Sequence, residues 1–522
     1  MILSSVRLPI EAGLPELKKA ACIQAGISPE KVLEMKLIRK SLDARRGRPF
    51  TFLYTVELIL EEEDRATCSF SVIKYTGAET PAPLVAGFGP AGMFCALVLA
   101  RAGLRPIVLE RGRPVEERCR DVELFWQGGA LREDSNVQFG EGGAGTFSDG
   151  KLTTLIRDKE GLSRFVLEEL VRAGAPEEIL YLNKPHIGTD KLKRIVKNIR
   201  EEILSLGGRI CFSSCVTGLD IQDGCLAGVR CGDLCYEGNR LFLGVGHSAR
   251  DTFQMLAENG ITMEKKAFSV GFRIEHLQRA IDQAQYREYA GSPYLTAADY
   301  KLSHTGRGRR GVYTFCMCPG GQVVAAASQQ GGVLTNGMSN FAREQENANA
   351  AVLISIMPQD FQEDDVLAGA AFQRELEKKA FAMGGENYRA PAQRLGDFLT
   401  GKASVDIGCV TPSYRPGVTL CDLNGLLPEP LCCELQEGLR IFGRKLPGFD
   451  CPDAILTGVE SRSSSPVRIV RDQKTGQSVS LSGLYPMGEG AGYAGGIMSA
   501  AIDGIRAACR AYPGCILPGY FI

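Results

Sequence analysis

The pattern of apolar and polar positions in the first part of the chain predicts a small separate unit. Segments of strand-like and helix-like periodicity follow one another here. A stretch at Thr76–Pro83 that carries glycine and prolines is typical of a linker. We therefore expect an N-terminal α/β module over residues 1–78. Its expected elements are a strand near Ile2–Leu8, a helix through Leu17–Ala25, and strands near Val32–Ser41 and Phe50–Leu60.

The next segment predicts the opening of a parallel sheet. A short apolar run ends at Gly87, a helix follows to Ala102, and a second strand covers Pro106–Leu109, which is a βαβ pattern. A helix from about Thr189 to Gly207, a strand at 210–212, turn-separated short strands and a strand at 241–243 continue the pattern. The predicted fold class is α/β, with a Rossmann-like domain that contains a β-meander.

The pattern changes again at about residue 261. Strands are expected at Ala267–Ile274 and Val312–Cys318, a hairpin turn at Pro319–Gly321, and helices near Asn340–Ile356 and Val366–Ala382. From residue 454 the chain returns to strand, Gly-rich turn and helix. We therefore expect a discontinuous nucleotide-binding domain, residues 83–260 and 454–522, with a mixed α+β substrate domain, residues 261–453, inserted into it.

A GxGxxG motif lies between the first predicted strand and helix of this domain. Its first glycine permits a tight turn, its second lets a pyrophosphate approach the backbone, and its third lets the helix pack closely on the strand. Glu110 ends the next strand and is placed to accept hydrogen bonds from the adenosine ribose. The motif comprises Gly87, Phe88, Gly89, Pro90, Ala91 and Gly92.

A second Gly-rich segment decides which dinucleotide is expected. Residues 485–504 predict a strand, a Gly-rich turn and a helix of small residues about 400 positions after the first motif. The N-terminus of such a helix stabilises the negative charge that a reduced flavin carries at its N1–C2=O edge. This pair of motifs favours FAD over NAD.

Together these motifs resemble the p-hydroxybenzoate-hydroxylase-like FAD/NAD(P)-binding fold, and more closely a family of uncharacterised FAD-dependent dehydrogenases. The resemblance covers most of residues 83–510. It rests on five segments, namely Gly142–Leu152, Gly246–Thr252, Phe315–Gly321, Thr335–Ser339 and Gly458–Arg468.

The resemblance implies which residues contact the cofactor. Gly87, Gly89 and Gly92 would hold the pyrophosphate and Glu110 the ribose. One departure is that Glu489 stands where this fold usually has Asp, and it reaches one methylene further. The rest of the expected cofactor set is Phe88, Pro90, Ala91, Arg111, Thr146, Ser148, Lys151, Gly246, Gly488, Gly496 and Ile497.

Several other residues have two interpretations. His247 either lies near the flavin or caps the following helix. Arg462 and Arg468 either clamp an anionic substrate or pair with local carboxylates. We expect the segment Arg273–His276 to be a solvated charge cluster. Catalytic roles are unassigned, with Lys151, His247 and Arg462 as the candidates.

Cys316 and Cys318 form the most suggestive redox pair in the chain. In a regular strand both sulfurs would face one side together with Thr314, at a separation that strains a disulfide. Cysteine is also a small buried hydrophobe, and the adjoining turn explains the segment by packing. We expect the pair to be structural.

Composition limits the partners. The net charge of −1 gives no overall field to hold nucleic acid or an anionic membrane, and no run of 18 apolar residues occurs. The 18 cysteines in a chain of this size are expected to be reduced thiols in the cytoplasm, and their spacing, with four histidines, predicts no metal site.

The predicted function is an FAD-dependent oxidoreductase that transfers hydride between flavin N5 and a small-molecule substrate. Only one dinucleotide fingerprint is present, so electrons come from the substrate, a transiently docked NAD(P)H, or a partner protein. Two rivals remain: a flavin monooxygenase, and a flavin-bearing protein whose N-terminal module binds RNA or a partner. For RNA binding, the basic residues of this module are offset by Glu61–Glu63.

Overall fold

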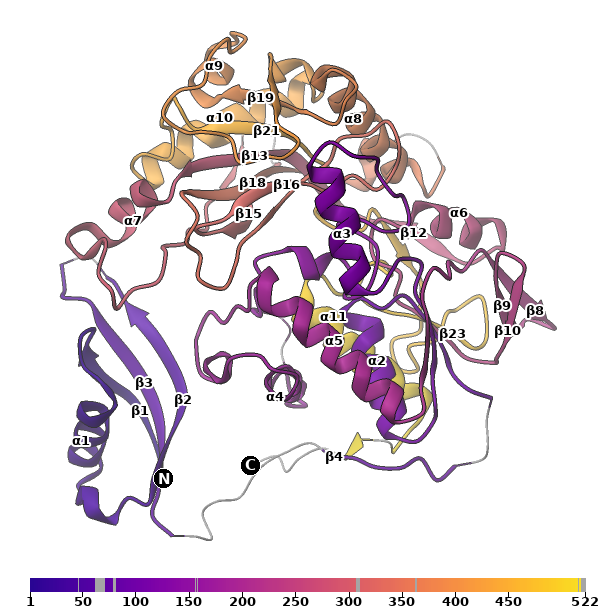
Figure 1. The fold of residues 1–522 in the computed structure, drawn as a ribbon, viewed down its shortest axis with the longest axis horizontal. Helices are drawn as coiled ribbons and strands as arrows, with labels where there is room; N and C mark the ends of the chain where they lie inside the picture. The colour runs from indigo at the N-terminus through magenta and orange to yellow at the C-terminus, as the bar shows by residue number, and fades with distance from the viewer. Residues whose placement is uncertain are drawn as a thin grey trace.

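A five-stranded parallel sheet forms the centre of the nucleotide-binding part (Figure 1). The computed structural model describes residues 1–45, 47–61, 71–77, 81–154, 156, 158–306, 310–361, 364–514 and 516–517. Within these residues the strand order is β23-β11-β5-β6-β7. The strands are β5 (Leu84–Ala86), β6 (Ile107–Leu109), β7 (Arg209–Cys211), β11 (Leu241–Leu243) and β23 (Leu484–Pro486). One strand of this sheet therefore comes from the far C-terminal part of the chain.

Helices cover one face of this sheet because they carry apolar side chains where they meet it. The helix α2 (Pro90–Arg101) is buried along nearly its whole length, and α11 (Ile497–Ala511) packs directly against it. Small residues permit this close approach: a Cβ on Gly504 would lie 2.1 Å from the Ala91 carbonyl oxygen. The helices α4 (Leu162–Arg172) and α5 (Thr189–Ser205) add to the same apolar core.

The other face of the sheet packs on a separate apolar cluster. A meander of β8 (Gly218–Gln222), β9 (Cys225–Cys231) and β10 (Leu234–Glu237) contributes to it, together with α6 (Arg250–Glu258). The predicted meander and its return to the parallel sheet at β11 are both present.

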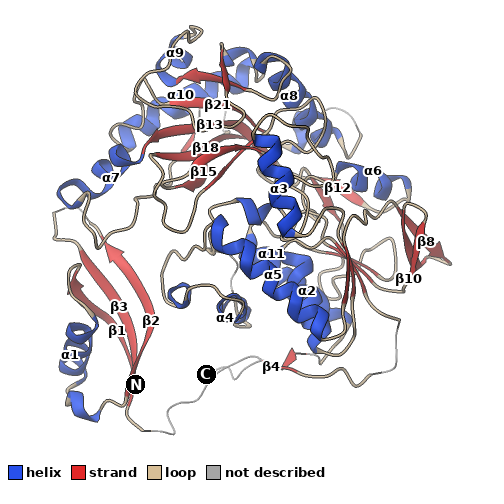
Figure 2. Ribbon diagram, in the orientation of Figure 1, coloured by secondary structure: helices blue, strands red, loops and turns tan. Residues whose placement is uncertain are grey.

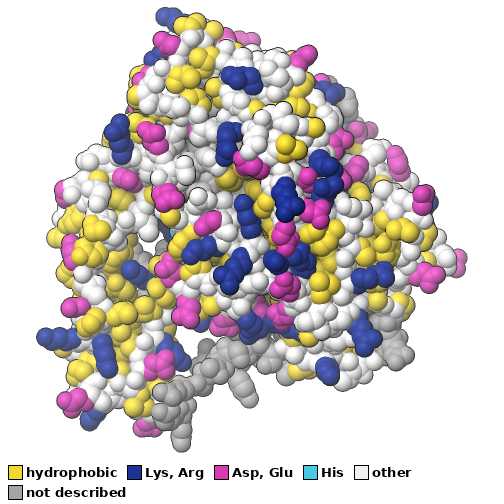
Figure 3. Space-filling model, in the orientation of Figure 1, with side chains coloured by type: hydrophobic (Ala, Val, Ile, Leu, Met, Phe, Trp, Pro, Cys, Tyr) yellow, Lys and Arg dark blue, Asp and Glu magenta, His cyan; other side chains and the backbone are white. Residues whose placement is uncertain are grey.

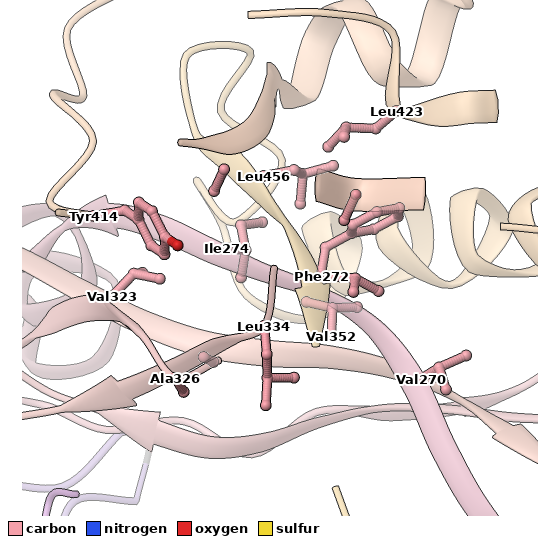
Figure 4. Packing of buried hydrophobic residues seen from close by; sticks show 14 of the residues in the cluster. Val270, Phe272, Ile274, Val323, Ala326, Leu334, Val352, Tyr414, Leu423 and Leu456 are labelled. Carbon is pink, nitrogen blue, oxygen red and sulfur yellow. The ribbon is translucent and has the colours of Figure 1, made fainter. Parts of the chain in front are cut away.

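A seven-stranded mixed sheet forms the second layer of the molecule, with order β14-β15-β18-β13-β21-β19-β20. Its core joins Val270, Phe272 and Ile274 of one strand to Val352 and Leu456 of its two neighbours (Figure 4). Its strands are β13 (Phe268–Leu277), β14 (Ser303–Thr305), β15 (Gly311–Cys318), β18 (Asn347–Ile356), β19 (Ala390–Arg394), β20 (Val418–Leu420) and β21 (Ile455–Glu460).

Helices surround this second sheet (Figure 2). They are α7 (Gln278–Tyr286), α8 (Ala368–Gly384), α9 (Leu395–Thr400) and α10 (Glu429–Lys445). Near the junction of the two sheets lie α3 (Val115–Trp126) and the strand pairs β12 (Met263–Lys265) with β22 (Val467–Ile469) and β16 (Gln322–Ala325) with β17 (Thr335–Met338). A short pair joins β4 (Ser71–Val72) to β24 (Ile516–Leu517).

The N-terminal module is an antiparallel sheet with one helix. Its elements are β1 (Ile2–Pro9), α1 (Leu14–Ala25), β2 (Glu34–Asp43) and β3 (Thr51–Ile59), and the strand order is β1-β3-β2. The module contacts the rest of the chain through the Phe50 ring. This ring stacks on the ring of Tyr289, with the two ring centroids 4.3 Å apart. A backbone hydrogen bond from the Lys40 amide to the Tyr181 carbonyl, 2.7 Å long, is a second contact between the module and the rest of the chain.

The structure corrects four expectations. Residues 347–356, expected in a helix, form strand β18, and Pro319–Gly321 does not close a hairpin, since β15 pairs with β18 and β16 with β17. Strand β21 belongs to the seven-stranded sheet although it follows residue 454. The expected solvated cluster Arg273–His276 is fully buried.

Two sequence expectations fall partly outside the described residues: the linker at Thr76–Pro83 and the acids at Glu62 and Glu63. Across the described part of the chain, no helix is both long and apolar enough to cross a membrane, and no group of three or more metal-ligating side chains occurs. On the face shown in Figure 3, acidic and basic side chains are interspersed over all parts of the molecule. This mixture agrees with the near-zero net charge.

Candidate FAD site

A cavity of about 600 Å³ lies between the two sheets. One wall follows the carboxyl ends of β5, β6 and β11, where Ala86, Leu109 and Gly244 line it. The opposite wall comes from the seven-stranded sheet and includes Tyr313, Phe315 and Glu460. Ligands of open parallel sheets bind at this edge, outside the carboxyl ends of the strands.

The three motif glycines have different surroundings. Gly87 has φ +89° and its Cβ would lie 2.5 Å from the Gly244 carbonyl oxygen, so it makes the tight turn. A Cβ on Gly92 would lie 1.9 Å from the Gly87 carbonyl oxygen, which is close helix-to-strand packing. A Cβ on Gly89 would come no closer than 3.6 Å to the protein, and Gly89 lines the cavity. Of the three, only Gly89 has room for a Cβ within the fold, so packing does not explain why it is a glycine.

Glu110 organises the backbone around this turn. One carboxylate oxygen accepts from the Phe88 amide at 2.7 Å, and the other accepts from Gly112 and Gly140 at 2.9 and 3.0 Å. The side chain also lines the cavity, where the motif predicts a ribose contact. Glu110 thus joins three loops in addition to its expected role toward the cofactor.

Arg118 shapes the Gly-rich segment and was missed by the sequence reasoning. Its guanidinium is fully buried and donates only to backbone carbonyls, including those of Asn136, Val137, Glu141 and Gly143, at 2.6 to 3.0 Å. Burial lowers the pKa of Arg118 to about 10, so the group stays charged at neutral pH. A cation under the loop opposes the partial negative charge of those carbonyls.

The structure brings most of the expected cofactor residues to the cavity. Thr146 is an exception, because its hydroxyl donates to the Glu141 carbonyl at 3.3 Å and its own carbonyl accepts from Thr189. Phe88, Gly92 and Gly488 are also absent from the residues that line the cavity. The expected residues that line the cavity are Gly87, Gly89, Pro90, Ala91, Glu110, Arg111, Ser148, Lys151, Gly246, Glu489, Gly496 and Ile497.

Two expected residues at the flavin end have their own contacts. Lys151 donates from Nζ to the Met317 carbonyl and so joins the Gly-rich segment to β15. Burial raises the pKa of Glu489 to about 7, against the opposing effect of Lys266. A carboxyl with that pKa is partly protonated near neutral pH and is able to donate as well as accept a hydrogen bond.

Arg462 belongs to a buried charge cluster, which we name the Arg250–Glu377–Arg462 cluster. Glu377 accepts from both guanidinium groups at 2.7 to 2.9 Å and from the Ser461 hydroxyl at 2.7 Å. Arg468, by contrast, lies 4.0 Å from Glu264 at the surface, so each of the two arginines pairs with a carboxylate, as the second of the two interpretations has it. The cluster holds two cations and one carboxylate, and Arg462 lines the cavity.

A second buried ion pair joins Arg273 to Glu460. The two side chains meet in a bidentate contact at 2.6 and 2.8 Å, and Arg273 also donates to the Cys316 carbonyl and to Asn336. Three segments of the cavity wall are thereby tied to one guanidinium. Arg273 was expected in solvent because no local pattern reveals its partner, which lies 187 residues away in the sequence.

Cys316 and Cys318 both line the cavity, but not as a regular strand would place them. A β-bulge between Phe315 and Cys318 inserts an extra residue, and Cys316 has φ +41°. Cys318 is buried, whereas Cys316 faces the cavity between the two sheets. The expected common orientation with Thr314 is therefore wrong. Burial raises the pKa of Cys316 to about 12 and that of Cys318 to about 11, which disfavours both thiolates.

The chemistry of the cavity fits an extended dinucleotide. Helices α2 and α11 both begin at it, at Gly89 and Gly496, and neither has a side-chain cap. The N–H groups at these helix starts are binding positions for an anion such as a pyrophosphate and for the negative edge of a flavin ring, and at α11 the Glu489 carboxyl accepts from the Gly496 amide. Fold and site thus define a protein with a Rossmann-like parallel sheet whose adjoining cavity suits a dinucleotide.

Comparisons with known proteins place the chain in a family. Residues 267–463 match the family model "FAD-dependent protein, C-terminal domain-like", and residues 1–59 match a domain of unknown function (DUF8436). An uncharacterized protein of Clostridium beijerinckii is 45% identical over 521 residues, covering 97% of each chain. The chain belongs to this family of FAD-dependent proteins, and FAD is its cofactor.

Solved structures with a similar arrangement include the halogenase PltM. It shows 10% identity and a TM-score of 0.40, with 84% of this chain and 69% of that chain covered. L-proline dehydrogenase from P. horikoshii shows 12% identity and a TM-score of 0.36, with 84% and 95% covered.

Replacing Glu110 by alanine should weaken FAD binding about 10- to 100-fold, because three backbone N–H groups lose their acceptor and the ribose loses a contact. The flavin absorption maximum should stay unchanged, since Glu110 is far from the ring in the motif's geometry. Dilution of the holoprotein followed by fluorescence of released FAD measures the effect. The exposed Glu117, changed to alanine, is the matched control; a shifted maximum for the Glu110 variant would contradict the assignment.

Proposed function

We propose that the protein is an FAD-dependent oxidoreductase that transfers hydride between flavin N5 and a small molecule. The observation that carries this proposal is the shared cavity: the dinucleotide motif forms one wall, and the seven-stranded sheet forms the other. A substrate bound against the second wall would face the cofactor held by the first. When bound, FAD supplies the ring that gives or takes the hydride.

The residues of the chain orient and tune this reaction. The N-terminus of α11 at Gly496 favours negative charge at the edge of the ring by about 0.3–1 kcal/mol. The bidentate Arg273–Glu460 pair holds the substrate wall in a fixed arrangement. Tyr313 and Phe315 add aromatic surface, while Asn336 adds a polar side chain. This mixed lining suits a small molecule with apolar and polar parts.

The second substrate is an electron partner that docks and leaves. The sequence contains one dinucleotide fingerprint, and the FAD motif uses it. We therefore infer a transiently bound nicotinamide or a partner protein rather than a resident NAD(P)H domain.

Reduction of the bound flavin by a panel of metabolites tests the proposal. We expect at least one small molecule to bleach the flavin absorbance without oxygen, and an electron acceptor to restore it. Rapid NAD(P)H consumption with peroxide release in air would instead indicate a monooxygenase. Failure of every hydride donor and of both nicotinamides, with FAD fully bound, would overturn the proposal.

Serine variants of Cys316 and Cys318 should keep FAD and remain reducible by the true substrate. The raised pKa values of both thiols and the bulged backbone favour a structural role over dithiol exchange. Anaerobic titration of each variant with the reductant found above is the measurement. Loss of turnover in either variant, with flavin content and fold intact, would make the pair catalytic.

A further inference from the structure

His247 lies where the middle of a bound FAD is expected. It follows β11, which lies between β5 and β23 in the parallel sheet. Strand β5 leads into the turn expected to bind the pyrophosphate, and β23 leads toward α11. The residue lines the cavity. Of its two interpretations, we pursue the one near the flavin: the N-cap of α6 is Ala249, and His247 Nδ1 contacts the Ser248 hydroxyl.

A chain of hydrogen bonds fixes the proton on the His247 ring. The Gln138 amide group donates from Nε2 to the Ala326 carbonyl at 3.4 Å, so its Oε1 is the acceptor for the Ser248 hydroxyl at 3.2 Å. That bond uses the only hydrogen of the hydroxyl. Ser248 Oγ, 2.9 Å from His247 Nδ1, must therefore accept, and Nδ1 carries the proton.

The surrounding charges keep the ring neutral. Arg462 and Arg250 face it from β21's end and from α6, and Glu377 of α8 compensates only part of their charge. Burial and the two guanidinium groups lower the pKa of His247 to about 3. Its Nε2 is therefore a bare acceptor at neutral pH.

Two other histidines have the reverse arrangement. The rings of His186 and His276 place Nε2 at 3.0 and 2.7 Å from the backbone carbonyls of Phe341 and Phe449. A carbonyl only accepts, so both rings carry the proton on Nε2. With four histidines in the chain, these rings are internal references for the tautomer of His247.

We propose that His247 is an FAD-binding residue whose Nε2 accepts a hydrogen bond from a hydroxyl group of the cofactor. The neighbouring guanidinium groups repel a cationic donor, so the group that donates to Nε2 should be neutral. Along the ribityl part of FAD, the neutral donors are hydroxyl groups. Thr335 adds an independent indication of a polar ligand, since its hydroxyl is buried without a hydrogen-bond partner among the described residues and the residue lines the same cavity. The proposal rests on FAD occupying this cavity but not on the direction of hydride transfer.

Nitrogen NMR of the ¹⁵N-histidine-labelled protein tests this proposal directly. The signal lost in His247→Gln should show a protonated Nδ1 and a bare Nε2 from pH 5.5 to 8, and its Nε2 shift should move when FAD is added to the apoprotein. A protonated Nε2, a titration within this pH range, or an Nε2 shift that FAD leaves unmoved would overturn the proposal. In the last case a substrate group remains as the donor.

Binding measurements separate a ligand contact from a packing role. His247→Leu should weaken FAD about tenfold, as expected for one lost hydrogen bond, while His247→Gln, which retains an acceptor, should lose less than about threefold. Ser248→Ala should shift the ring toward the Nε2–H tautomer and weaken FAD as well. Equal losses for the leucine and glutamine variants would contradict an acceptor role. A protein that binds FAD but accepts no hydride would refute the proposed function and leave this assignment standing.

Discussion

Gly89→Val should give a folded protein that no longer retains FAD. The Cβ position at Gly89 lies 3.6 Å from its nearest protein atom, and its backbone does not require glycine, so the chain tolerates the side chain. The valine methyl groups would instead occupy the space where a pyrophosphate approaches the first turn of α2. We expect FAD affinity to fall at least about a hundredfold, which is about 2.7 kcal/mol.

The flavin absorbance of the purified variant and FAD titration of its apoprotein measure this loss. Two other glycines make the result specific. Gly425→Val, at a position with no atom within 4 Å, should keep FAD. Gly92→Ala should disturb the fold itself, because its Cβ would lie 1.9 Å from the Gly87 carbonyl oxygen. Stoichiometric FAD in a folded Gly89→Val protein would show that the site lies elsewhere.

Local motifs account for the part of the site that the sequence predicted. The turn at Gly87–Gly92, the acid at Glu110 and the helix start at Gly496 each depend on a few consecutive residues, and all three meet at one cavity. Side-chain direction was less predictable. Thr146 lies in the short 3₁₀ turn Ala144–Phe147, which turns its hydroxyl into the protein and leaves Ser148 at the cavity.

Long-range pairing accounts for what the sequence could not show. Arg273 and Glu377 find their partners 187 and 85 residues away, and no local pattern reveals such a pair. The segment 347–356 contains good helix formers such as alanine and leucine, yet it is buried between β13 and β15 as a strand. Tertiary burial outweighed local propensity there. Residues 347–356 pair as strand β18 with β13, and Arg273–His276 of β13 are therefore buried instead of solvated.

The buried charges have a common arrangement around the cavity. Arg118 supports the Gly-rich segment from below, Arg273 ties the substrate wall, and the Arg250–Glu377–Arg462 cluster stands beside His247. Each guanidinium joins segments that are distant in the sequence. Rigid support of this kind keeps the binding groups of the cavity in place.

Glu377→Gln should be strongly destabilising, because it leaves two buried guanidinium groups facing each other without a carboxylate. Removing one partner of a buried ion pair typically costs about 3–5 kcal/mol. For a chain of 522 residues we therefore expect the thermal midpoint of the holoprotein to fall by roughly 3–5 °C at neutral pH. Scanning calorimetry at a fixed scan rate and fixed FAD concentration measures the difference. Glu375→Gln on the same helix is the control, since its side chain is 69% exposed and bonds only to Lys378 among the contacts seen.

The effect should also depend on pH in a defined direction. The two arginines hold the pKa of Glu377 far below its ordinary value of 4.5 despite the opposing effect of burial. A carboxyl with a depressed folded pKa stabilises the protein fully above its unfolded pKa and loses that contribution as the pH falls through the folded pKa. The difference in stability between the parent protein and Glu377→Gln should thus be constant above about pH 6. It should become smaller below about pH 4.5. A gap that widens on acidification, or a variant as stable as Glu375→Gln at neutral pH, would show that the carboxylate does not hold the cluster together.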